Sequence, residues 1–166
     1  METILIIDDE EALCQTLEKV LSKEGYRAVW TTTALSVVDL LCKERPSCVL
    51  LDLKLGDTDG LTVLQTIKDQ DKDLPIFLLT AYETVKSAVA AMKSGAFHYL
   101  AKPFDNEVIV DSINKAFDAY RRRGNMQSSR RAVREPYRLE QCVGNVVCQI
   151  HHLARFPRDP TTLLLF

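Results

Sequence analysis

The chain lacks the segments that mark membrane and exported proteins. No apolar run in it approaches the roughly 18–20 residues that a helix needs to cross a bilayer. Its first residues, METILIIDDE, contain neither a basic n-region nor a cleavage site of small residues, so they do not form a signal peptide. These absences predict a cytoplasmic protein that makes no contact with a membrane.

Cysteine and glycine are present, but not in the patterns of disulfide scaffolds, zinc sites or nucleotide-binding loops. The five cysteines include no C-x-x-C pair, and their odd number argues against a disulfide scaffold. None of the six glycines precedes a lysine, so the G-x-x-x-x-G-K-[ST] loop of an ATPase is missing. Zinc is a minor alternative at Cys142, Cys148, His151 and His152, because the C-x₅-C spacing is unfamiliar and the segment has the pattern of an amphipathic helix.

Charge is divided unevenly along the chain. Residues 1–120 contain 12 Lys and Arg against 20 Asp and Glu, whereas residues 121–166 contain 9 against 3. The arginines between Arg121 and Arg134 have no interleaved aromatics and no recognition-helix pattern, which favours a solvated linker over a nucleic-acid contact. At 166 residues, the chain has room for one domain and a short appendage. We therefore expect an acidic domain followed by a basic tail.

Five short apolar runs are each followed by a stretch with helical periodicity. The runs are rich in Ile, Leu and Val without clean alternation, which is typical of strands buried on both faces. This order predicts an α/β fold: a doubly wound, five-stranded parallel sheet with a short C-terminal tail. The predicted strands are Thr3–Ile7, Arg27–Trp30, Cys48–Leu51, Ile76–Leu79 and Phe97–Leu100. The residues placed to begin or end helices are Gly25, Asp59, Gly95 and Asp105.

Polar residues follow four of these runs. In doubly wound sheets, functional groups gather at the carboxyl ends of the strands. Three carboxylates, one hydroxyl and one ammonium are therefore expected on one rim of the sheet. They belong to Asp8, Asp9, Asp52, Thr80 and Lys102.

Carboxylates packed this closely repel one another unless a cation lies among them. Mg²⁺ prefers such hard oxygen ligands and completes its shell with water and phosphate oxygens. Asp9 and Asp52 are the candidate direct ligands, and Asp8 is expected to act through water. A carboxylate could then attack a phosphoryl group whose charge the metal and a lysine neutralise. Taken singly, each residue has a structural reading, such as helix capping or a solvated charge; it is their joint occurrence that favours a site.

Two other α/β families fit the strand ends poorly. A flavodoxin-like FMN protein needs a loop rich in Ser, Thr and Gly after the first strand, where this chain has Asp-Asp-Glu-Glu. A phosphatase of the haloacid dehalogenase type needs D-x-D there, and the chain offers D-D-E. Both families are rejected on the residues that follow the first strand, because the fold alone does not determine the function.

Four segments resemble the motifs of a known family. ILIIDDE, LLDLKLGDTDGL, FLLTAYE and YLAKPF are similar to the four motifs of two-component receiver domains, and the resemblance runs from Thr3 to Tyr120. It implies a flavodoxin-like (βα)₅ receiver fold. It also implies that Asp52 accepts a phosphoryl group from a sensor histidine kinase in a Mg²⁺-dependent reaction.

The resemblance implies a ligand set for the metal. Asp8 and Asp9 would form the acidic Mg²⁺ pocket, which Asp52 completes. The backbone carbonyl of Lys54 would supply a further ligand.

The resemblance also implies a phosphoryl-binding set and a switch. Thr80 and Lys102 would each bind a phosphoryl oxygen, and the Lys102–Pro103 peptide would be cis. Tyr99 would be the aromatic switch that turns inward when Thr80 moves, although a half-buried strand aromatic is an even alternative. Gly56 stands where many relatives have Pro, which predicts a looser loop after the acceptor.

The segment TAYETVKSAVAAMKSGAFHYLAKPF is similar to receivers of NtrC-like, sigma-54-dependent activators, which continue into an AAA+ ATPase. CVGNVVCQIHHLA and PTTLLLF resemble the start of that ATPase. The expected division is a receiver at 1–120, a basic linker at 121–138 and the possible start of a truncated AAA+ domain at 139–166. A truncated activator, an excised fragment and a free-standing receiver with a vestigial tail all stay open.

Three functions follow from this reading. The first is a phosphorylation-controlled receiver that switches a transcriptional output, touching DNA only through domains absent here. The alternative is a stand-alone signalling module or phosphate sink without transcriptional output. The third, a metal-dependent phosphohydrolase, is an enzyme and is not expected. The 4-3-4 spacing of Ile109, Ile113, Ala116 and Tyr120 raises the hypothesis of a homodimer through the fourth and fifth helix region.

Overall fold

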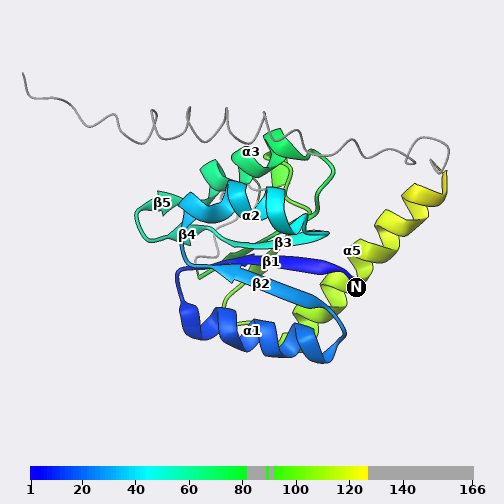
Figure 1. The fold of residues 1–166 in the computed structure, drawn as a ribbon, viewed down its shortest axis with the longest axis horizontal. Helices are drawn as coiled ribbons and strands as arrows, with labels where there is room; N and C mark the ends of the chain where they lie inside the picture. The colour runs from blue at the N-terminus through cyan, green and yellow to red at the C-terminus, as the bar shows by residue number, and fades with distance from the viewer. Residues whose placement is uncertain (82–88, 90–91, 127–166) are drawn as a thin grey trace, which may run out of the picture. The chain divides into compact units, whose positions relative to one another are not determined.

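Five parallel strands form the central sheet of the protein. The computed structural model describes residues 1–81, 89 and 92–126, with side chains as far as Asp118. The strands lie in the order β2-β1-β3-β6-β7, so the chain runs outward from β1 in both directions (Figure 1). This confirms the predicted α/β fold with a five-stranded parallel sheet. The strands are β1 (Thr3–Ile7), β2 (Arg27–Thr31), β3 (Cys48–Asp52), β6 (Ile76–Thr80) and β7 (His98–Ala101).

Helices cover both faces of the sheet. α1 (Glu11–Lys23) and α5 (Asn106–Met126) lie on one face, and α2 (Val37–Glu44) and α3 (Gly60–Gln70) lie on the other (Figure 1). Each face has its own core cluster. Every residue of β1, β3 and β6 is buried, which explains why their sequences do not alternate.

The helix ends follow the predicted signals in the described part of the chain. α1 ends shortly before Gly25, which has a φ of +83°. The Asp59 carboxylate accepts the Leu61 N–H at 3.0 Å and caps α3. For the predicted fourth helix, Met92 is helical and Gly95 has a φ of +93°. Most of that helix lies outside the described residues.

Three features differ from the expectations. α5 continues to Met126, into the segment expected to be a linker, and the rest of that segment lies outside the described residues. A short 3₁₀ helix, η1 (Ala34–Ser36), precedes α2. The loop after β3 forms a two-stranded antiparallel hairpin, β4 (Lys54–Leu55) and β5 (Thr58–Asp59). Strands of two residues are too short to show a periodicity in the sequence.

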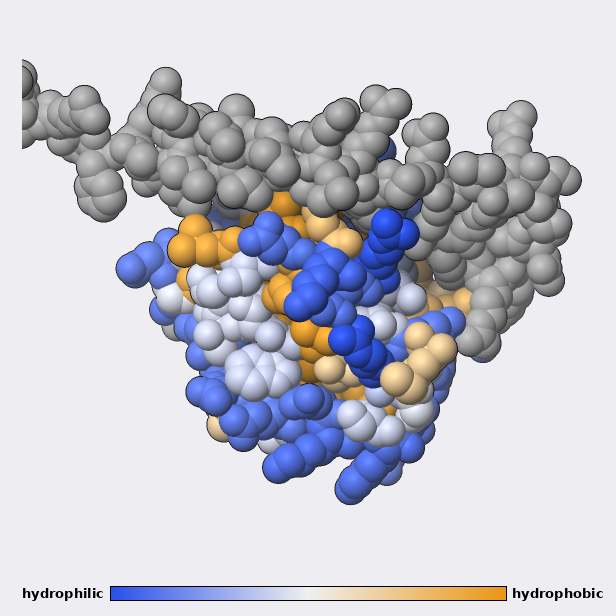
Figure 2. All heavy atoms as spheres, in the orientation of Figure 1, coloured by the Kyte–Doolittle hydropathy of each residue, from blue (hydrophilic) through white to orange (hydrophobic). Residues whose placement is uncertain are grey.

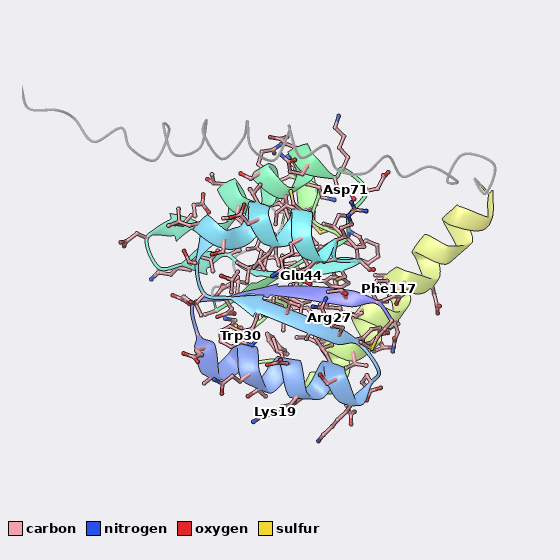
Figure 3. All side chains as sticks on the ribbon, viewed as in Figure 1. Lys19, Arg27, Trp30, Glu44, Asp71 and Phe117 are labelled. Carbon is pink, nitrogen blue, oxygen red and sulfur yellow. The ribbon has the colours of Figure 1, made fainter. Side chains whose placement is uncertain are left out.

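The open edge of the sheet at β2 carries polar contacts to the helices on both sides. Arg27 of β2 lies beside Glu44 of α2, with Nη1 and Oε2 2.6 Å apart (Figure 3). On the other side, the Trp30 Nε1–H donates to Glu18 of α1 at 3.0 Å. The surface over α1 is mostly hydrophilic (Figure 2). Among the described residues, no helix combines the length and the apolar character needed to span a membrane.

Candidate functional site

The ends of two neighbouring central strands bring three carboxylates together. β1 leads directly into Asp8 and Asp9, and β3 ends at Asp52. Because β1 and β3 are paired in parallel, with Ile7 opposite Leu51, these residues emerge side by side. One oxygen of each of the three carboxylates lies within 4.8 Å of the others. Within the described residues, the predicted cluster therefore exists.

Lys102 crosses the rim from the end of β7 to join two of these carboxylates. Its Nζ lies 2.6 Å from Asp8 Oδ2 and 2.8 Å from Asp52 Oδ2. Asp8 is fully buried, Asp52 is 7% exposed, and only 16% of the Lys102 side chain is exposed. The backbone N–H of Lys102 donates to the Thr80 carbonyl at 2.6 Å, which holds the two strand ends together. The lysine is thus the internal counter-ion of two largely buried carboxylates.

Burial and ion pairing act in opposite directions on these groups. Burial raises the pKa of Asp8, and the hydrogen bond from Lys102 offsets only part of this effect. Burial alone would lower the pKa of Lys102, but its hydrogen bonds to Asp52 and Asp8 outweigh burial, so the pKa is raised. Lys102 therefore stays charged at neutral pH, and a further cation in the cluster would favour the ionised form of Asp8.

Backbone amides orient each carboxylate as well. Asp8 Oδ1 accepts the Glu10 N–H at 3.0 Å, and Asp52 Oδ1 accepts the Lys54 N–H at 3.2 Å. Asp9, whose side chain is exposed, accepts the Gly56 N–H on Oδ2 at 3.1 Å. The donors for Asp52 and Asp9 both belong to the β4–β5 hairpin, so the hairpin helps to shape the cluster.

A cavity of about 450 Å³ opens over this rim. Thr80 lines it and is almost fully buried, with 2% exposed. Asp9 and Asp52 face the cavity, whereas Asp8 is not part of its wall. The full lining is Asp9, Glu10, Asp52, Leu53, Lys54, Thr80, Ala81 and Lys102. Carboxylates, a hydroxyl and an ammonium thus face one space that is wide enough for a phosphate group.

The donor set fits Mg²⁺. Three carboxylates supply hard oxygen atoms, and the cavity leaves room for water and phosphate oxygens, which this ion retains in its shell. Asp9 and Asp52 would hold the ion from the cavity wall, and Asp8 lies behind them. Lys54 lines the cavity, but a ligand role for its carbonyl stays a prediction.

Tyr99 lies on β7 apart from the cavity wall. It is partly buried and packs against the core cluster on the α2 and α3 face. This placement fits both a switch and an ordinary strand aromatic, so the switch role stays a prediction. The predicted cis peptide between Lys102 and Pro103 is confirmed.

Two glycines make contacts at the site that were not expected from the sequence. Gly56 has a φ of +57° and its N–H donates to Asp9, while the expectation that it loosens the loop stays a prediction. The dipeptide Gly56-Asp57 is a known signal for a two-residue hairpin turn, so the hairpin was detectable. Gly60 lies so close to β3 that an added Cβ would meet the Asp52 carbonyl oxygen at 2.4 Å. No sequence signal gives that contact.

Comparison with known proteins agrees with this geometry. The family described as "Response regulator receiver domain" matches residues 4–114. The chain is 34% identical over 118 residues to the C4-dicarboxylate transport transcriptional regulatory protein DctD of Pseudomonas aeruginosa, covering 71% of this chain and 26% of the relative. It is 36% identical over 114 residues to sporulation initiation phosphotransferase F of Bacillus subtilis, covering 69% and 92%.

A solved structure shows the same fold. The solution structure of the beryllofluoride-activated NtrC4 receiver domain dimer matches with a TM-score of 0.69 and 31% identity, covering 72% of this chain and 99% of that one.

Among the sequence relatives, the chain spans only about a quarter of the length of DctD but nearly all of the phosphotransferase.

Proposed function

Because the chain belongs to the response regulator receiver domain family, we propose that it accepts a phosphoryl group on Asp52 from a sensor histidine kinase in a Mg²⁺-dependent reaction. Phosphorylation would then switch a transcriptional output. The observation that carries the proposal is the position of Asp52 at the wall of a cavity, 2.8 Å from the Lys102 Nζ and clustered with the carboxylates of Asp8 and Asp9.

The chemistry assigned to Asp52 is nucleophilic. One carboxylate oxygen attacks phosphorus, a P–O bond forms, and the bond from phosphorus to the histidine nitrogen of the kinase breaks. Lys102 already lies against Asp52, so its ammonium can neutralise a phosphoryl oxygen without a large movement. When bound among the carboxylates, Mg²⁺ supplies further charge neutralisation and orients the phosphoryl group.

The proposed switch starts at Thr80. A phosphoryl group adds roughly −1.5 to −2 charge and new acceptor oxygens, which attract a nearby hydroxyl and ammonium. Thr80 lines the cavity and its carbonyl binds the backbone of Lys102, so movement of one strand end affects the other. Tyr99, on β7 shortly before Lys102, would follow as the aromatic switch. The response is a shift between two populated states of one fold.

The transcriptional output rests on relatives such as DctD, which is named as a transcriptional regulator. The NtrC-like subfamily, the linker at 121–138 and the start of an AAA+ domain at 139–166 are part of this proposal. The last two lie outside the described residues. DNA would be contacted only indirectly, through output domains, and the cytoplasm is the expected location.

A stand-alone role is the second candidate. The observation that favours it is the match to sporulation initiation phosphotransferase F, of which the chain covers 92%. In this case the domain would pass phosphoryl groups on or dock a partner, without a transcriptional output. A phosphohydrolase with multiple turnover on external esters is not proposed.

A homodimer through the fourth and fifth helix region is proposed as well. Apolar side chains are exposed there among the described residues, at 47% for Val89, 49% for Met92 and 46% for Val108. The similar NtrC4 receiver domain is described as a dimer. Light scattering that finds only a monomer, with and without beryllofluoride, would remove this part of the proposal.

The test is incubation with acetyl phosphate in the presence and absence of Mg²⁺, followed by intact mass spectrometry. We expect one phosphate per chain, dependent on Mg²⁺, acid-stable and base-labile as an acyl phosphate is. Asp52→Asn removes it. Asp57→Asn, at an exposed aspartate a few residues away, is the matched control and leaves it unchanged. Phosphate that persists in Asp52→Asn would contradict the proposal.

A further inference from the structure

The tip of the β4–β5 hairpin reaches the acidic cluster through one backbone hydrogen bond. The hairpin pairs Lys54 with Asp59 and Leu55 with Thr58, which places Gly56 in the turn. The Gly56 N–H donates to Asp9 Oδ2 at 3.1 Å. The two residues are far apart in sequence, so the contact is a feature of the folded protein.

The position of the Asp9 side chain depends on this one hydrogen bond more than the positions of Asp8 and Asp52 depend on any single contact. Asp8 and Asp52 are buried and are each held by Lys102 and a following amide. Asp9 is exposed, and within the described residues the Gly56 N–H is the hydrogen-bond donor recorded for its carboxylate. Without that donor, the side chain would exchange among rotamers in solvent.

We propose that the Gly56 amide is a positioning group for the metal pocket. It holds Asp9 toward the cavity before the ion arrives. A carboxylate has about four lone-pair sites on two oxygens, so one bond to Gly56 leaves Asp9 free to bind Mg²⁺ as well. Outer hydrogen bonds of this kind orient metal ligands, and their loss typically lowers metal affinity about 10- to 100-fold. The inference rests on the proposed function, because it presumes that the cluster binds Mg²⁺.

The backbone at this position accounts for the residue type. Gly56 has a φ of +57°, a left-handed conformation that glycine adopts without strain and asparagine tolerates. Proline is fixed near a φ of roughly −65° and has no N–H, so it can supply neither the turn nor the donor. A Cβ added to Gly56 would meet no atom within 4 Å, so the constraint on the residue type comes from the left-handed backbone and not from a lack of space.

The hairpin also links the metal pocket to α3. Asp59 pairs with Lys54 across the hairpin, and its carboxylate caps the first turn of α3. Lys54 in turn donates its N–H to Asp52. One short element thus contacts Asp9, Asp52 and the start of α3.

The test compares wild type, Gly56→Asn and Gly56→Pro by titrating the ¹⁵N-labelled full chain with Mg²⁺ and following amide shifts by NMR. We expect Mg²⁺ affinity about 10-fold weaker in Gly56→Pro and within about twofold of wild type in Gly56→Asn. In the wild type, the Gly56 amide is expected to exchange with solvent more slowly than an unstructured glycine. This exchange measurement tests the Gly56–Asp9 hydrogen bond in the wild type, even where Gly56→Pro does not fold.

The outcomes separate this inference from the proposed function. Equal Mg²⁺ affinity in folded Gly56→Pro and wild type overturns the positioning role and leaves the proposed function intact. Exchange of the Gly56 amide at the rate of an unstructured glycine overturns it too. A wild-type chain without any Mg²⁺-dependent shift contradicts the proposed function itself, and the positioning role with it.

Discussion

Replacing Lys102 by methionine removes the counter-ion of two largely buried carboxylates while keeping most of the side-chain volume. Asp8 is fully buried and Asp52 is 7% exposed, and both lie within 3 Å of the lysine ammonium, at 2.6 and 2.8 Å. Without it, the Asp8 and Asp52 carboxylates face each other in a largely buried site with no counter-ion. We therefore expect Lys102→Met to be much less stable than wild type when Mg²⁺ is absent.

The expected loss follows from burial. Removing one partner of a fully buried ion pair costs about 3–5 kcal/mol. Lys102 borders a cavity and 16% of its side chain is exposed, so we expect a loss somewhat below this range, at about 2–3 kcal/mol. For a domain of this size, such a loss corresponds to a fall in Tm of about 10 °C.

Mg²⁺ should restore most of the lost stability. The ion would place positive charge between the same carboxylates that the lysine leaves unpaired, and binding to the native state alone raises its stability. The stabilisation by Mg²⁺ is therefore expected to be larger in Lys102→Met than in wild type.

Thermal unfolding followed by circular dichroism, with EDTA and with excess Mg²⁺, measures both effects. Lys115→Met is the matched control, because Lys115 pairs with Asp111 on an exposed helix face, where the two side chains are 73% and 62% exposed. We expect that control to change stability by less than about 0.5 kcal/mol, with or without Mg²⁺. A Tm for Lys102→Met equal to that of wild type in EDTA would refute the reasoning, as would a loss that Mg²⁺ does not reduce.

Three further predictions concern the packing and the helix caps of the domain. Gly60→Ala places a Cβ 2.4 Å from the Asp52 carbonyl oxygen, a backbone atom that does not move easily. Urea unfolding is therefore expected to show that the free energy of unfolding falls by about 2–3 kcal/mol. Asp59→Ala removes the cap of α3 and is expected to cost about 1 kcal/mol in the same assay, and an unchanged midpoint would contradict the capping role. Cys14 and Cys48 are buried thiols, and burial raises the pKa of Cys14 to about 12. Iodoacetamide at pH 8 should therefore label both cysteines only after unfolding. Peptide mass spectrometry measures this labelling.

The strands and the site were predictable because both follow from local sequence and simple topology. β1, β3 and β6 are buried on both faces, which leaves an apolar run in the sequence. Parallel strands bring their carboxyl ends to one edge, so Asp8, Asp52 and Lys102 were expected near one another. The structure brings them together as expected.

The contacts that refine the site depend on packing between distant segments. The sequence does not show that Lys102 bridges Asp8 and Asp52, because this follows from the lengths and rotamers of side chains across three strands. The close approach of Gly60 to β3 depends on how α3 begins. α5 extends through Arg121–Arg123 to Met126, because arginine is a good helix former as well as a linker residue.

The most direct test of the central claim is a crystal structure of the full chain with Mg²⁺ and beryllofluoride. We predict one metal ion about 2.0–2.1 Å from carboxylate oxygens of both Asp9 and Asp52, with the beryllium group on Asp52 and Lys102 turned to one of its fluorines. An ion bound elsewhere, or a beryllium group on any other residue, would contradict the account.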